Sequence, residues 1–220
     1  MGEATWAPTP AAPSMATEQK LVCGYVGMPN DDEALEQALA AIHEAIDNIN
    51  QRDWNWAAVY EDIVSDATLV DYPVPSNFKR PFRLVRLDAD GLSIGRIPFV
   101  PWMSFLNEYS EGQAASGDPC VYTVANVKEY GTISLDCTPS ADWVSKYPTL
   151  RLWYYRKLQY ENQDGAPDWP SEFTPYVRNY AKAILAGTYA PAKVAFAHGL
   201  AEAAMNRLVR DDNNTQTDWE

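Results

Sequence analysis

The clearest hydrophobic pattern in the chain lies between residues 31 and 50. Its apolar side chains recur at spacings of four, three, four and three residues, which places them on one stripe of a helix: Leu35, Leu39, Ile42, Ile46 and Ile49. Asn30 or Asp31 can cap this helix, and acids follow in the first turn, where the helix dipole favours negative charge. The pattern predicts a helix over residues 31–50 that packs on another helix, in its own chain or in a neighbouring copy.

The middle of the chain, residues 54–160, has short apolar runs separated by turn residues, a pattern typical of strands. The most apolar run reads LRLWYY, and another alternates apolar and basic side chains. We expect antiparallel strands and hairpins: 82–87 and 92–97 around a turn at 88–91, 120–124 and 130–135 around 126–129, and 150–155.

Helical periodicity returns after the strands. Ser171 is the expected cap of a helix over residues 171–187, Gly187 its expected end, and Pro191 opens an alanine-rich helix over residues 190–210. Because the strands are grouped and do not alternate with helices, the pattern predicts an α+β fold.

The two ends of the chain differ in composition from its body. Residues 1–29 begin with a segment rich in Ala, Pro and Thr that carries too few large apolar side chains to fold alone, so we expect a flexible arm and lead-in. Residues 211–220 are polar and acidic, and we expect a fraying tail. A single domain is therefore expected over residues 30–210.

Charge adds a constraint on partners. The chain has 30 acidic and 17 basic side chains, a net charge of −13, which disfavours specific binding to nucleic acid. Residues 31–66 hold ten acids and one base, whereas residues 79–96 hold five bases and two acids. Opposite patches of this kind suit contacts between copies of the chain, although for any single patch a solvated face is the favoured interpretation.

Three cysteines, widely spaced and without a C-x-x-C pair, indicate free thiols in a reducing compartment. The N-terminal residues lack the charged and apolar regions of a signal peptide, and no apolar run reaches the length of a membrane span, so we expect no membrane partner.

A search for reactive residues predicts no catalytic site, no metal site and no cofactor. The two histidines, His43 and His198, are interpreted as packing residues, and no phosphate-binding glycine loop or nucleophile motif occurs. A pair of carboxylates brought together by the fold, with aromatic side chains lining a sugar groove, remains an alternative. Packing in the core and at subunit interfaces is the favoured role of the aromatic residues.

Two blocks of sequence resemble a known family. The first, residues 42–85, has tryptophans after the helix and then a Tyr-x-x-Pro-x-x-Phe-x-Arg type signature, held here by Trp54, Trp56, Tyr72, Pro75, Phe78, Lys79 and Arg80. The second, residues 133–160, ends in a Leu-x-Tyr-Tyr-Arg strand at Leu152 to Arg156. Together with the closing helices, they resemble the head-to-tail adaptor proteins of short-tailed bacteriophages over residues 33–210.

The resemblance implies a structural virion protein and not an enzyme. Such adaptors form a ring, usually of twelve copies, under the portal protein; they extend the DNA channel and attach the tail. The implied partners are the portal protein, a tail or nozzle protein, further copies of the chain, and double-stranded DNA that passes without specific binding. The implied location is the neck of the virion, after assembly in the host cytoplasm.

The resemblance also directs attention to particular residues. Portal docking is expected on the last helix, at Leu200, Met205, Leu208 and Val209, with packing on the first helix as the equal alternative. Acids expected to face the channel are Glu36, Glu44 and Asp47, because like charge lets DNA slide. Two other functions stay open: a carbohydrate-binding or carbohydrate-cleaving virion domain, and another neck or tail-completion protein.

Overall fold

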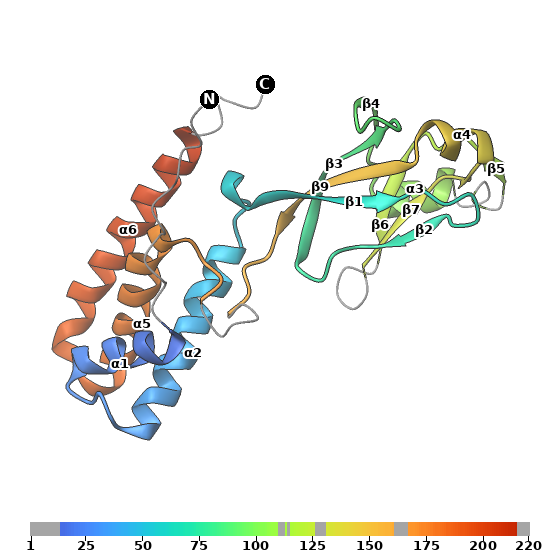
Figure 1. Cartoon of the computed structure of the whole chain (residues 1–220). Helices are drawn as coiled ribbons and strands as arrows, with labels where there is room; N and C mark the ends of the chain where they lie inside the picture. The colour runs from blue at the N-terminus through green and yellow to red at the C-terminus, as the bar shows by residue number, and fades with distance from the viewer. Residues whose placement is uncertain (1–13, 110–112, 114, 126–130, 161–166, 215–220) are drawn as a thin grey trace. The chain divides into compact units, whose positions relative to one another are not determined.

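The structure, a computed structural model, describes residues 14–109, 113, 115–125, 131–160 and 167–214. It confirms an α+β fold with helices at the start, antiparallel sheets in the middle and two helices at the end (Figure 1). The chain forms two compact units where the sequence predicted one domain. We call residues 1–52 and 158–220 the helical unit, and residues 53–157 the β unit.

The helical unit is built from helices that are far apart in the sequence. In chain order its elements are α1 (Met15–Val26), α2 (Asp32–Asn50), the 3-10 turn η3 (Ser171–Phe173), α5 (Thr174–Tyr189), the 3-10 turn η4 (Pro191–Lys193) and α6 (Val194–Asn214). Helix α5 packs against α1, α2 and α6, so it is the central helix of the unit (Figure 1).

Helix α1 corrects the expectation of a flexible lead-in. The Ser14 side chain accepts a hydrogen bond from the Thr17 N–H. Gly27, at φ 86°, ends the helix, and its N–H donates to backbone carbonyls of the last turn. Its polar Glu18 is buried and binds Arg178 of α5 through two hydrogen bonds of 2.8 and 2.9 Å. A partner 160 residues away thus holds a segment whose own apolar pattern is weak. Residues 1–13 of the expected arm lie outside the described residues.

Helix α2 begins at the expected cap, where the Asp31 side chain accepts a hydrogen bond of 2.8 Å from the Ala34 N–H. Its buried face is broader than the expected stripe and rich in alanine: Ala34, Ala38, Ala41, Ile42, Ala45, Ile46 and Ile49. Leu35 and Leu39 are only half-buried. Small side chains let α2 approach its neighbouring helices closely, which turns the two leucines towards the edge of the contact.

The last two helices begin and end at residues other than those expected. Ser171 opens a 3-10 turn and gives no side-chain cap to the backbone. Gly187 lies inside α5, and Pro191 marks the break between the helices. Residues 211–214, expected in a fraying tail, continue α6 to Asn214, where the Arg52 guanidinium donates a 3.0 Å hydrogen bond to Asn213.

The β unit contains two antiparallel sheets and a short parallel pair. The four-stranded sheet has the order β1 (Ala58–Val64), β9 (Thr149–Arg156), β3 (Phe78–Leu87) and β4 (Ser93–Ile97); the three-stranded sheet has the order β2 (Asp71–Pro73), β7 (Thr132–Leu135) and β6 (Tyr122–Ala125). The remaining elements are η1 (Asn55–Ala57), α3 (Trp102–Glu108), β5 (Ser116–Gly117), β8 (Thr138–Pro139) and α4 (Ala141–Lys146).

Both expected hairpins are present. Strands β3 and β4 join through a turn in which Gly91 takes φ 77°, a conformation that favours glycine, and β6 pairs with β7 in antiparallel register. Their inward side chains and those of β2, β9 and α4 form the core: Tyr72, Phe78, Leu84, Ile97, Tyr122, Val124, Ile133, Leu135, Trp143, Leu150, Leu152 and Tyr154. The core therefore draws on both sheets.

Candidate interaction surfaces

The outer face of the four-stranded sheet gathers arginines and aromatic rings. Because paired residues in antiparallel strands point to the same side, the register builds this face row by row. One row runs Asp62, Arg151, Val85 and Arg96 across all four strands, the next runs Tyr60, Trp153 and Arg83, and a third pairs Tyr155 with Arg80. The opposite face carries Leu152, Leu84 and Ile97 into the core.

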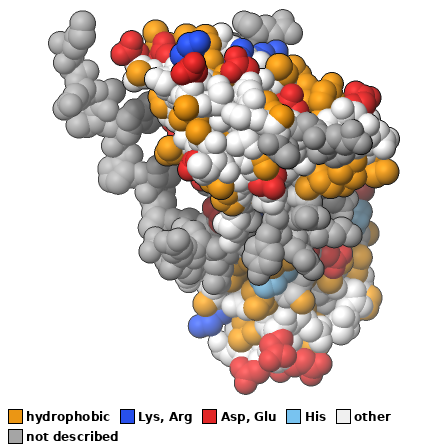
Figure 2. Space-filling view, turned by 90° about the vertical axis from the view of Figure 1, so that its right-hand side faces the viewer, with side chains coloured by type: hydrophobic (Ala, Val, Ile, Leu, Met, Phe, Trp, Pro, Cys, Tyr) orange, Lys and Arg blue, Asp and Glu red, His pale blue; other side chains and the backbone are white. Residues whose placement is uncertain are grey.

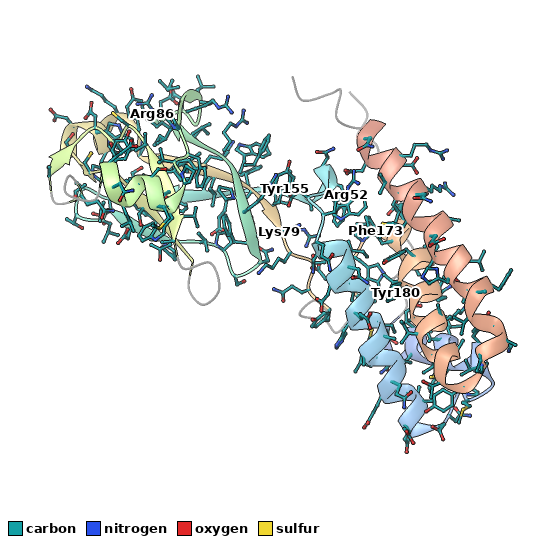
Figure 3. All side chains as sticks on the ribbon, turned by 180° about the vertical axis from the view of Figure 1, so that it is seen from behind. Arg52, Lys79, Arg86, Tyr155, Phe173 and Tyr180 are labelled. Atoms are coloured by element: carbon teal, nitrogen blue, oxygen red, sulfur yellow. The ribbon has the colours of Figure 1, made fainter. Side chains whose placement is uncertain are left out.

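Ring contacts hold these arginines in place. The guanidinium carbon of Arg151 lies 4.3 Å from the centre of the Tyr60 ring, that of Arg80 lies 5.2 Å from Tyr155, and that of Arg83 lies 5.5 Å from Trp153. Figure 3 labels Tyr155 on β9. Such contacts stabilise a cation while leaving its N–H groups available to a partner. We call Tyr60, Arg80, Phe82, Arg83, Arg96, Arg151, Trp153 and Tyr155 the arginine–aromatic face.

Only part of the positive charge on this face is neutralised. Arg151 forms a bidentate pair with Asp62, at 2.6 and 2.8 Å, and these hydrogen bonds lower the pKa of the Asp62 carboxyl. Arg80 pairs with Asp53 at 2.9 Å. Among the described residues, no carboxylate lies within 4 Å of the guanidinium of Arg83 or Arg96. The face therefore carries an uncompensated positive charge in a chain that is otherwise acidic.

The outward side of α2 has the opposite character. Its exposed acids lie on the helix face opposite the buried alanines and isoleucines, and they are Asp32, Glu33, Glu36, Glu44 and Asp47. Figure 2 shows acidic side chains gathered at the lower end of the molecule, where Figure 1 places the start of α2. The two surfaces, one basic and one acidic, belong to different units of the chain.

Comparison with known proteins decides the identity of the chain. The family model described as SU10 adaptor protein matches residues 19–219. The chain belongs to the SU10 adaptor protein family. It is a structural component of a bacteriophage virion, a head-to-tail adaptor, and the family implies binding to portal and tail proteins. A comparison with curated proteins finds no significant match.

The predicted portal-docking residues of the adaptor do not share one face of α6. Leu200 is exposed, Met205 and Val209 are half-buried, and Leu208 is buried against the unit's own interior. Sequence periodicity missed Phe196, which is 66% exposed one helical turn before Leu200. A large aromatic side chain on an alanine-rich helix was the only signal that could have identified it.

The predicted channel acids of the adaptor differ in their surroundings. Glu44 accepts a 2.7 Å hydrogen bond from the hydroxyl of Tyr180 on α5, and Asp47 accepts one of 3.1 Å from Tyr160. Burial is the main cause that raises the pKa of Tyr180, with the bond to Glu44 adding to it. Figure 3 shows Tyr180 on the side of α5 towards α2. Glu36 is exposed without such a tyrosine partner in the described residues.

The histidines of the adaptor occupy packing and surface positions. The His43 ring stacks on Tyr160 with 3.9 Å between ring centres, and His198 lies on the exposed side of α6, 3.4 Å from Glu202. Within the described parts of the chain, no group of three or more His, Cys, Asp or Glu side chains is arranged to hold a metal ion, and no helix is long and apolar enough to cross a membrane.

Proposed function

We propose that this adaptor forms a cyclic ring, of about twelve copies, under the portal protein of a short-tailed bacteriophage. The ring extends the DNA channel and provides the platform to which a tail or nozzle protein binds. The observation that carries this proposal is the family match across residues 19–219, which spans both units of the chain. Separate acidic and basic surfaces support it, because a closed ring needs two different, complementary faces on each copy.

Portal docking is assigned in this proposal to the outward side of α6. Phe196 and Leu200 are 66% and 41% exposed, and such large apolar side chains in solvent suit burial against a partner helix. Leu208, which is 8% exposed, is assigned to packing inside the helical unit. Met205 and Val209, which are half-buried, lie at the edge of that packing.

The channel lining is assigned to Glu36, Glu44 and Asp47. Negative side chains repel the phosphates of double-stranded DNA, so the DNA slides through without specific binding. Replacing all three by lysine should slow DNA ejection or trap DNA in the neck. Unchanged DNA retention and ejection would remove these residues from the channel.

The decisive experiment mixes the purified adaptor with the portal protein of the same virus and measures mass by light scattering and shape by electron microscopy. A ring on the portal supports the proposal, and a persistent monomer that ignores the portal contradicts it. Docking is tested with Phe196→Ser and Leu200→Ser together. The matched control is Ile184→Ser on α5, because Ile184 is also an exposed apolar residue of the helical unit, at 44%. Equal loss of portal binding in both variants would reject α6 as the docking helix.

A further inference from the structure

The arginine–aromatic face has the composition of a protein-binding surface. Tyrosine, tryptophan and arginine are the residues most enriched where proteins bind each other tightly. Tyr60 and Phe82 are each 52% exposed. Large apolar side chains thus stand in solvent on the same face as the arginines, and burial against a partner would remove them from water.

Three arginines of this face, Arg80, Arg83 and Arg151, are held against aromatic rings before any partner arrives. Arg83 lies over the Trp153 ring, and no carboxylate of the described residues pairs with its guanidinium. Arg96 is exposed at the end of a row that spans the sheet. Side chains that are already ordered lose little conformational entropy on binding, and a carboxylate supplies the acceptor that a guanidinium lacks. The partner that fits this face is therefore acidic.

The helical unit of another copy supplies an acidic surface that fits this face. That unit contains 17 acidic and 7 basic side chains. Its densest cluster is the start of α2, where Asp32 and Glu33 are exposed after the capping Asp31 and have no basic partner within 4 Å among the described residues. We call Asp32 and Glu33 the acidic corner. Nucleic acid suits the face less well, because Asp62 lies within it and the chain has a net charge of −13.

We propose that the arginine–aromatic face of one copy binds the acidic corner of the next copy, and that this contact joins the subunits of the ring. The inference rests on the proposed function, because it needs copies held side by side on a portal. The face and the corner belong to different units of one chain, so each copy binds one neighbour through its face and the other neighbour through its corner. Contacts of this heterologous kind close into a ring when the rotation between copies closes.

Charge exchange on the full-length protein tests the contact. One variant carries Arg83→Glu and Arg96→Glu, a second carries Asp32→Lys and Glu33→Lys, and a third combines all four changes. The matched control is Lys146→Glu, which reverses an exposed base of the β unit outside the face. Each variant is mixed with the portal protein, and the fraction of portals that carry a ring is counted by electron microscopy. If Arg83→Glu prevents folding, the variant with Arg96→Glu alone, at an exposed position, is used in the same assay.

The expected result is a loss of rings by about tenfold or more in each two-site variant, partial recovery in the combined variant, and no change in the control. Rings of wild-type abundance in the Arg83 and Arg96 variants would overturn the inference while leaving the proposed function standing. A wild-type protein that never binds the portal would overturn both. Intact rings with weaker retention of a double-stranded DNA fragment in a gel-shift assay would assign the face to nucleic acid and also overturn the inference.

Discussion

The helical unit and the β unit differ in their net charge and in the side chains that fill their cores. The helical unit carries a net charge of −10 and packs alanine and isoleucine between closely spaced helices. The β unit carries a net charge of −3 and packs bulky rings such as Trp143 and Tyr122 into a core to which both sheets contribute. One unit thus offers an acidic surface over a core of small side chains, and the other places arginine among aromatic rings. The difference explains how one acidic chain can present an acidic surface on one unit and a partly basic surface on the other.

The largest expected loss of stability comes from a substitution in the aromatic core of the β unit. Trp143 is 1% exposed, and Trp143→Ala would remove a large buried ring and leave a cavity. We expect the free energy of unfolding to fall by about 3–5 kcal/mol. Hydrogen exchange followed by mass spectrometry should place the loss of protection in residues 53–157. The control is Trp102→Ala, because Trp102 is 39% exposed; an equal loss in both variants would contradict the assigned core.

The second effect concerns a buried ion pair in the helical unit. Glu18 is 2% exposed, and Glu18→Ala would leave the Arg178 guanidinium without its carboxylate. Because Arg178 keeps partial access to water, we expect a loss of about 2 kcal/mol, less than for a fully buried pair. Urea unfolding monitored by circular dichroism measures it. Glu36→Ala, at an exposed acid, is the control and should change the unfolding midpoint little. If Glu18→Ala behaved the same way, the Glu18–Arg178 pair would contribute little to stability.

A smaller effect tests the cap of α2. Asp31→Ala removes the acceptor of the Ala34 N–H and should cost about 1 kcal/mol, whereas Asp31→Asn keeps a capping oxygen and should cost much less. Thermal unfolding of the two variants, side by side, measures the difference. Equal midpoints would mean that the first turn of α2 is held by packing and not by its cap.

The smallest effect is the pH dependence of the Asp62–Arg151 pair. Hydrogen bonds from Arg151 lower the pKa of Asp62 in the folded protein, so this pair stabilises the β unit above the carboxyl's unfolded pKa. The contribution is lost as pH falls through the folded pKa. Since the pair is partly exposed, we expect about 0.5 kcal/mol or less. Unfolding midpoints measured from pH 6 downwards should show a shallower fall in Asp62→Asn than in the wild-type protein; parallel curves would contradict it.

Several elements could be predicted from the sequence because their signals are local. The Asp31 cap, the helix that follows it, the turn at Gly91 and the strand of residues 149–156 each depend on neighbours within a few positions. The order of helices and strands, and with it the α+β class, follows from the same local patterns. The resemblance of residues 33–210 to phage adaptors agrees with the family to which the chain belongs.

Only the tertiary structure decided the contacts that join distant segments. Helix α1 depends on Arg178, 160 residues after Glu18, and no apolar period in residues 15–26 reveals that partner. The arginine–aromatic face exists because Tyr60 pairs with Trp153, and Trp153 with Arg83. Alternation along one strand shows which side chains share a face, but register with a strand about ninety residues away decides which of them touch. Periodicity is a property of each segment, whereas burial and pairing belong to the folded chain.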